Sequence, residues 1–264
     1  MSPRILRRPA VWLIVALLIG VARPSLSHAQ RTDSTALGSA LVRVDEMRSQ
    51  GAFRDALSRL SELRSTHGDQ VEILWRISIT RADIGRAADT DGAAGEHYRE
   101  ALRLAETALT VDASNAHSHL ARAVAEGRLA LGAGTQERVQ RSRAVKTHAD
   151  RAIEIDPTLP GAFHVRGRWH REVADLNFLE RTLVRTVYGG LPDASFEQAV
   201  RDFERAIELE NVRFHHLELA KTYLKMDRPV DARTHLQTAI DLPAREPFAQ
   251  RHKEEAQELL DELS

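Results

Sequence analysis

Histidine is the residue type in this chain that most readily suggests chemistry, since 12 of the 264 residues are histidines and imidazole both binds zinc and transfers protons. A zinc site on a helix favours histidines four residues apart, as in a His-Glu-x-x-His pattern. His117 and His119 are two residues apart, and His215 and His216 are adjacent, so on a helix the members of each pair diverge. We therefore expect no metal site, and histidines that are solvated or line a groove.

Other patterns that could carry chemistry are weaker still. Asp89-Thr90-Asp91-Gly92 is similar to the start of a calcium loop, but Ala87 stands where an acidic ligand belongs and no glutamate closes the loop, so a flexible insertion is expected. Glu172 and Glu180 could pair as acid and base, yet charged residues cover every expected helix. The chain has no cysteine, no phosphate-binding glycine loop and no nucleophile elbow. The sequence thus predicts no catalytic residue, no cofactor and no enzyme.

A recurring pattern of small and apolar residues, at offsets of four and seven, predicts the helices that would position these side chains. These offsets place three residues on one stripe of a helix, and small side chains let a neighbouring helix approach closely. The last copy reads as a tetratricopeptide (TPR) unit of about 34 residues, a helix hairpin that buries its apolar face by stacking on neighbours. The five copies are Ala56…Leu60…Leu63, Ala101…Ala105…Ala108, Val145…Ala149…Ala152, Ala199…Phe203…Ala206 and Ala232…Leu236…Ala239.

The copies start 45, 44, 54 and 33 residues apart, so three intervals exceed the basic period. We expect the surplus as insertions between the two helices of a repeat, near residues 84–95, 131–137 and 175–195. Residues 178–188 predict an amphipathic helix that packs over the edge of the fourth repeat beside Trp169, and acidic residues alternate with apolar ones over 247–263, as in a terminal cap. The predicted fold is all-α, a TPR-like superhelix of about five helix hairpins with an inserted helix and a C-terminal capping helix.

The first 29 residues predict an export signal. Three arginines precede an uncharged apolar run, residues 10–22, and Ser27-His28-Ala29 is a small-x-small site for a signal peptidase. Cleavage after Ala29 would give an exported, periplasmic protein; an uncleaved anchor is the alternative, although a membrane span needs about 20 residues. The expected domains are a signal peptide at 1–29, a short flexible N-terminus at 30–36 and a repeat domain at 37–264. Beyond residue 29, 33 basic and 38 acidic residues remain, so no nucleic-acid partner is expected.

The register of the first helices predicts a concave ligand groove. Its surface runs from apolar at the N-terminal end to cationic at the C-terminal end, which suits an amphipathic acidic helix or extended peptide, and equally an anionic lipid. The predicted groove residues are Trp75, Ile79, His117, Leu120, Val124, His164, Arg168, Arg171, Phe214, Lys221 and Lys225.

One segment is more specific than the repeat positions. Gly167, Arg168, Trp169 and His170 are followed by the inserted amphipathic stretch and by a Gly-Gly-Leu-Pro loop at residues 189–192. Over roughly residues 37–263 the chain resembles the regulator of microtubule dynamics family, whose helical domain carries a similar Gly-Arg-Trp-His segment, an inserted helix and a Pro-containing loop. The resemblance implies a TPR-like domain without known catalysis, with eukaryotic relatives associated with microtubules or mitochondria and one tethering branch linked with phospholipid binding.

The export signal sets this chain apart from those relatives, which have their own targeting segments. An exported bacterial protein would meet no microtubule, so we expect the fold to carry over and the microtubule role not to. The expected function is a non-enzymatic exported scaffold that binds a protein or peptide partner in its concave groove, an acidic one given the cationic end. The alternative is a phospholipid-binding or tethering module in the same groove, with the headgroup at Arg168, Arg171 and Lys221.

Overall fold

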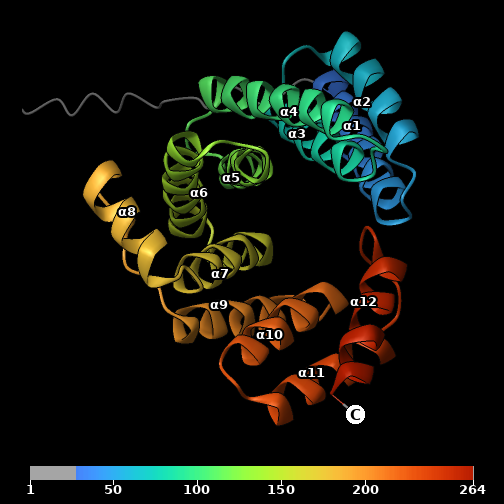
Figure 1. Cartoon of the computed structure of the whole chain (residues 1–264). Coiled ribbons are helices and arrows are strands. Elements are labelled where there is room, and N and C mark those ends of the chain that lie inside the picture. Colours follow the sequence, from blue (N-terminus) through green and yellow to red (C-terminus); the bar gives the residue numbers. More distant parts are fainter. Residues whose placement is uncertain (1–27, 264) are drawn as a thin grey trace, which may run out of the picture. The chain divides into compact units, whose positions relative to one another are not determined.

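The computed structural model describes residues 28–263, which form twelve helices and no strand (Figure 1). Residues 37–264 form one compact unit, and the segment 1–36 forms another. The signal-peptide prediction falls almost entirely outside the described residues, and residues 30–36, expected as a flexible segment, belong to the first helix. No helix within 28–263 has both the length and the hydropathy that crossing a membrane requires. The helices are α1 (His28–Ser49), α2 (Phe53–His67), α3 (Val71–Arg86), α4 (Asp91–Val111), α5 (Ala116–Leu131), α6 (Thr135–Ile155), α7 (Pro160–Ala174), α8 (Phe178–Tyr188), α9 (Phe196–Leu209), α10 (Arg213–Lys225), α11 (Pro229–Asp241) and α12 (Ala249–Glu262).

The unit formed by residues 37–264 is a stack of helix hairpins, as predicted. Residues of α1 from Leu37 onwards pack on α2, and the next four hairpins pair α3 with α4, α5 with α6, α7 with α9 and α10 with α11. The first helices of these four hairpins, α3, α5, α7 and α10, also contact one another in series. We call this row of first helices the inner wall, because in a superhelical repeat the first helices form the concave surface.

The recurring small residues are what allow the hairpins to close. Ala101, Ala105 and Ala108 on α4 have no exposed surface, and neither have Ala199 and Phe203 on α9. A larger side chain at any of these alanines would have to displace a packed neighbour, because protein interiors leave few voids. The stripe read from the sequence is therefore the core of each hairpin.

The long repeats were predicted to carry their extra residues as insertions between the two helices of a repeat. At two of the three predicted positions this was wrong. Only residues 87–90 link α3 to α4, and only 132–134 link α5 to α6. The extra length extends the second helices instead, so that α4 and α6 have 21 residues each. Adding turns to a helix satisfies each new backbone group within the helix, which a loop of the same length would not do. The third insertion does form a separate element, α8.

The prediction that α8 packs its apolar stripe over the edge of the fourth repeat was wrong. Phe178 and Leu179 are 78% and 76% exposed, and Val184 is the buried residue of the helix. The helix is fastened through backbone atoms: Arg143 of α6 donates to the carbonyl oxygens of Tyr188 and Gly190, the second at 2.6 Å. Hydrogen bonds to its C-terminal end, rather than burial of its stripe, therefore set its orientation beside α6 (Figure 1).

The capping helix α12 does more than terminate the array. It packs on α10 and α11 through Ala256, which is fully buried. At its start, the ring of Phe248 lies 5.0 Å from the ring of Phe53 at the beginning of α2, measured between centroids. The C-terminal cap thus reaches back to the first hairpins of the same unit.

Candidate functional site

All eleven predicted groove residues lie on α3, α5, α7 or α10, but the apolar end of the groove is largely filled by its own side chains. Trp75 is only 7% exposed; its Nε1 donates to Glu72 at 3.1 Å and its ring stacks on His117 at 4.5 Å. Leu120 and Val124 are half-buried, each against alanines of neighbouring helices. This end therefore offers a partner narrow strips of apolar surface rather than an open hydrophobic trough.

The predicted cationic end is partly neutralised by a carboxylate that the sequence analysis missed. Glu218 of α10 accepts from Arg171 at 2.7 Å and from Lys221 at 3.0 Å, and lies 3.4 Å from Arg168. Burial opposes ionisation of Glu218, but Arg168, Arg171 and Lys221 hold its pKa well below the usual range. Glu218 precedes Lys221 by three residues, so the i,i+3 spacing on a helix was the available signal.

The remaining predicted cations also have partners within the chain. Lys221 pairs with Glu255 of α12, and Lys225 with Asp175 at 2.7 Å. Of the predicted cations, Arg168 is therefore the one with the longest ion pair. The sequence shows that these residues are cations, but only the fold shows that carboxylates of the same chain neutralise much of their charge.

Two further arginines of the inner wall were missed. Arg128 follows Val124 by four residues and so continues the stripe of α5, and it has no hydrogen bond or ion pair with any described residue. Arg86, at the end of α3, donates from Nη2 to Nε2 of His252 at 2.9 Å, and its guanidinium lies over the ring of Phe248 at 4.3 Å. Neither arginine has a carboxylate within ion-pair distance among residues 28–263.

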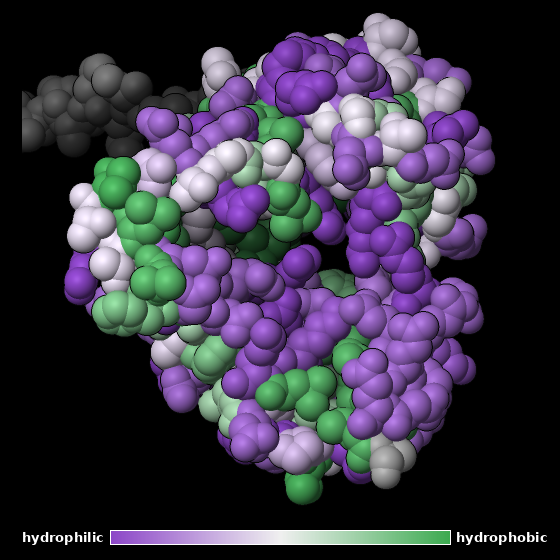
Figure 2. All heavy atoms as spheres, viewed as in Figure 1, coloured by the Kyte–Doolittle hydropathy of each residue, from purple (hydrophilic) through white to green (hydrophobic). Residues whose placement is uncertain are grey.

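Arg86, Arg128 and Arg168 lie on α3, α5 and α7, first helices that contact one another in series. Burial, the guanidiniums of Arg128 and Arg251 and, more weakly, that of Arg168 lower the pKa of Arg86 to about 10. Burial and the charge of Arg168 also lower the pKa of Arg128. Burial is the largest cause of both shifts, and the like charges of neighbouring arginines add to it. Figure 2 shows a hollow near the centre of this face of the unit, bordered mainly by hydrophilic residues.

The Gly-Arg-Trp-His segment is a junction between helices. A Cβ on Gly167 would lie 3.1 Å from the Phe203 ring, so α7 and α9 approach too closely for a larger residue. Trp169 donates from Nε1 to the carbonyl and hydroxyl oxygens of Ser142 on α6, at 2.8 and 2.9 Å, and packs edge-on against the buried ring of His170. Trp169 therefore joins α7 to α6.

Six of the histidines form three pairs between helices. In each pair the two Nδ1 atoms lie within hydrogen-bond distance, so one ring donates and the other accepts. Burial lowers the pKa of His148 and of His216 to about 4, and that of His215 to about 3. In the part of the chain that the structure describes, no three or more histidine and acidic residues come together to hold a metal ion. The pairs are His119 with His148 at 2.8 Å, His164 with His215 at 2.9 Å and His216 with His235 at 2.9 Å.

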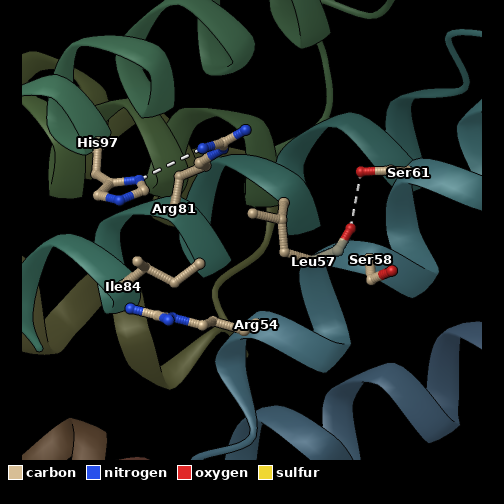
Figure 3. A pocket seen from close by; sticks show the side chains of 7 residues that line it. All are labelled: Arg54, Leu57, Ser58, Ser61, Arg81, Ile84 and His97. Atoms are coloured by element: carbon tan, nitrogen blue, oxygen red, sulfur yellow. Dashed lines mark hydrogen bonds between the residues drawn. The ribbon is translucent and has the colours of Figure 1, made fainter.

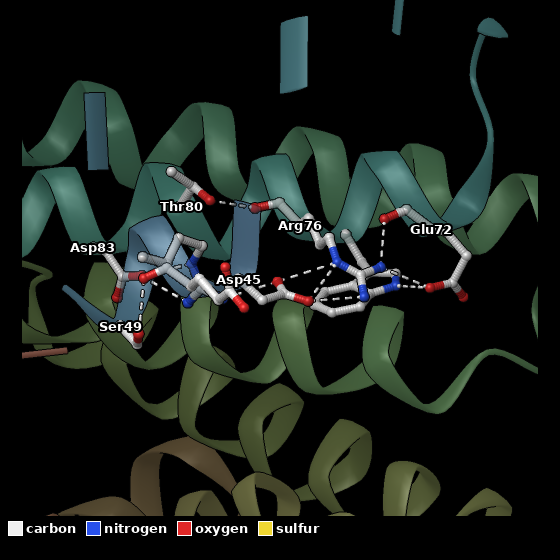
Figure 4. A network of polar contacts seen from close by, with 9 residues as sticks. Asp45, Ser49, Glu72, Arg76, Thr80 and Asp83 are labelled. Atoms are coloured by element: carbon white, nitrogen blue, oxygen red, sulfur yellow. Dashed lines mark hydrogen bonds and ion pairs between the residues drawn. The ribbon is translucent and has the colours of Figure 1, made fainter. Parts of the chain in front are cut away.

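Ion pairs between α1 and α3 form a second polar network (Figure 4). Arg76 contacts Asp45 at 3.0 Å and Glu72 at 2.8 Å, and Arg48 contacts Asp83 at 2.7 Å. Every charge in this network has an opposite partner, so it fixes the first two hairpins against each other without offering a free charge to a ligand.

Two adjoining cavities of about 500 and 370 Å³ lie away from the predicted groove, between α2, α3 and α4. In the larger one, Arg81 lies 3.4 Å from Nδ1 of His97, and burial together with the charge of Arg81 lowers the pKa of His97 (Figure 3). Both cavities are open to the surface. The larger is lined by Arg54, Leu57, Ser58, Ser61, Arg81, Ile84 and His97.

The fold is that of a solved TPR protein. A thermophilic TPR protein from Thermus thermophilus superposes with a TM-score of 0.61 at 16% sequence identity, covering 84% of this chain and 98% of that one. At this identity the likeness shows the fold alone. The protein is thus a TPR-like helical repeat.

Sequence comparisons carry the relationship further. The chain is 27% identical to regulator of microtubule dynamics protein 3 of Mus musculus over 207 residues, 77% of this chain and 44% of that protein. It is 25% identical to regulator of microtubule dynamics protein 2 of Homo sapiens over 237 residues, 88% of this chain and 58% of that protein. The chain therefore spans about half the length of these relatives. The family profile of regulator of microtubule dynamics protein 1-3 matches residues 40–264, and the chain belongs to this family.

Proposed function

We propose that the protein is a non-enzymatic scaffold that binds an acidic protein or peptide segment along its inner wall. The observation that carries the proposal is the continuous row of α3, α5, α7 and α10, on which Arg86 and Arg128 have no carboxylate partner among the described residues. Superhelical repeats bind extended or helical segments on this surface, and unpaired cations favour acidic ones.

Photo-crosslinking tests the proposal. A photoreactive residue in place of Val124, half-buried on the inner wall, is expected to capture a partner in the native compartment. The matched control is Val111, which is 52% exposed at the end of α4. Once the partner has been identified, binding of the purified partner should shield position 124 from a labelling reagent and should not shield position 111. Equal capture at both positions, or protection of neither, contradicts the proposal.

We further propose that the protein is exported and acts in the periplasm, because of the N-terminal arginines, the apolar run and the small-x-small site. Intact-mass measurement of exported material should show the chain beginning at Gln30. Regulation of microtubule dynamics, which the names of the relatives describe, is not part of the proposed function, since such a compartment holds no microtubule. The phospholipid alternative uses the same wall, and a co-purifying lipid mass in native mass spectrometry would favour it.

A further inference from the structure

We propose that Arg86, Arg128 and Arg168 together form the binding site for a carboxylate of the partner polypeptide. The proposal rests on the function proposed above, since it names the group that the inner wall recognises and the residues that hold it. Arg168 belongs to the cationic set expected from the sequence, whereas Arg86 and Arg128 stand in place of Arg171 and Lys221.

The three arginines come from successive first helices, α3, α5 and α7, and each lacks full compensation. Arg128 has no polar partner among residues 28–263, and the polar contact of Arg86 is with His252. Because an arginine side chain only donates, Nε2 of His252 accepts, so this histidine is neutral and adds no negative charge. Arg168 lies 3.4 Å from Glu218, a carboxylate that already has two closer cations.

Other half-buried arginines of the unit differ from Arg128 in having a polar partner. Arg143 donates to a backbone carbonyl oxygen, Arg81 contacts His97, and two more form ion pairs with carboxylates. Arg76 has two carboxylate partners, and Arg166 contacts Asp202 at 2.6 Å and Asp150 at 3.2 Å. Burial and, after it, repulsion by neighbouring guanidiniums lower the pKa of Arg86 and of Arg128, so keeping both charged in the folded protein costs stability. Bound negative charge would relieve that repulsion, and perturbed charges of this kind gather at functional sites.

The surroundings favour a carboxylate on a polypeptide over a lipid headgroup. Guanidinium groups bind carboxylates through two parallel hydrogen bonds, in a geometry that lysine cannot reproduce. A lipid would also need extended apolar surface for its acyl chains, since about 0.8 kcal/mol is gained for each buried CH₂ group. Ile79, Leu120 and Val124 are half-buried and packed on alanines, and the two cavities described above open between α2, α3 and α4 instead.

The test uses the full-length protein with a fluorescein-labelled ten-residue glutamate peptide, and a glutamine peptide of equal length as the probe control. By fluorescence anisotropy, Arg128→Gln and Arg86→Gln should each weaken binding of the glutamate peptide about tenfold or more, and Arg128→Lys should restore it only in part. Arg185→Gln on α8, an exposed arginine outside the wall, is the matched control and should leave binding unchanged. Thermal unfolding of Arg128→Gln should be unchanged or shifted to higher temperature, because a like charge is removed.

Three results would overturn the proposal. One is unchanged affinity of Arg128→Gln for the glutamate peptide, and another is equal binding of the glutamine and glutamate peptides. The third is binding of vesicles of anionic phospholipid by a protein that does not bind the glutamate peptide, which would support the lipid alternative. None of these results affects photo-crosslinking at Val124. The carboxylate site can therefore fail while the proposed protein-binding function stands, and the protein-binding function can fail while the carboxylate site stands.

Discussion

The guanidinium of Arg86 lies over the ring of Phe248, with its central carbon 4.3 Å from the ring centre, so the end of α3 meets the start of α12. Phe248 adopts a φ of 63°, in the left-handed region that bulky residues rarely occupy. Such backbone strain persists only where surrounding contacts hold it, here the rings of Phe53 and His252 and the charge of Arg86. Phe248 therefore joins the start of the capping helix to the first two hairpins of the unit.

Removing this contact should open the unit. Phe248→Ala is expected to lower the free energy of unfolding by about 1–3 kcal/mol and to increase the radius of gyration measured by X-ray scattering. Phe53→Ala should act through the same contact, so a double-mutant cycle should give a coupling of about 0.5–1.5 kcal/mol. Strictly additive single-mutant effects would show that the two rings do not hold the ends together.

Trp169 is expected to be the most costly aromatic residue to truncate. It is 4% exposed and its indole N–H has two acceptors on Ser142, so Trp169→Ala should lower stability by about 3–5 kcal/mol in urea unfolding. Trp169→Phe retains most of the packing and should cost less, through the hydrogen bonds it gives up, each worth about 1 kcal/mol. If both variants lost the same free energy of unfolding, the hydrogen bonds to Ser142 would account for the whole effect and the packing of the ring for none of it.

Acidification should destabilise the protein through its histidine pairs. The folded state holds the pKa of His148 and of His216 at about 4, below the ordinary value of 6.5 in the unfolded chain. Their contribution is fully present above pH 6.5 and is lost as the pH falls towards 4, because the unfolded chain binds protons first. Urea unfolding at pH 7.5 and at pH 5 should show this loss, and His148→Gln should make the pH dependence shallower. A profile identical to that of the unaltered protein would contradict the role of this pair.

The buried carboxylate at the cationic end, Glu218, should contribute strongly to the stability of the fold. Glu218→Gln leaves Arg171, whose side chain is 9% exposed, without its buried carboxylate, and is expected to cost about 3–5 kcal/mol of stability. Glu255→Gln is the control, since it removes the more exposed partner of Lys221 and should cost about 1 kcal/mol or less. The two variants are compared by thermal unfolding, and similar melting temperatures would argue against an internal role for Glu218.

The two faces of α8 should respond differently to substitution. Leu179→Ser combined with Leu183→Ser changes side chains that are 76% and 46% exposed, and should alter stability by about 0.5 kcal/mol or less. Val184→Ser changes the buried residue of the same helix and should destabilise by about 1–2 kcal/mol in urea unfolding. A large loss in the double variant would mean that the apolar stripe is covered after all.

The sequence by itself determined the helices, their pairing and the residues that each hairpin buries. The stripe Ala199…Phe203…Ala206 is fully buried as predicted, because helical periodicity and side-chain size are local properties that are the same in every repeat. The same reasoning placed the groove residues on the correct helices. It did not place the surplus of the long repeats, because lengthening a helix and inserting a loop are indistinguishable by spacing alone.

The tertiary structure alone decided which charges remain free and which elements meet. Arg171 and Lys221 carry the same charge in the sequence as Arg128, yet Glu218 forms ion pairs with the first two and not with the third. The outcome depends on burial and on which helices converge, and electrostatic energies change severalfold with both. The contact of Arg86 with Phe248 and the solvent-facing stripe of α8 have the same origin, since each is set by how distant segments pack and not by the local pattern.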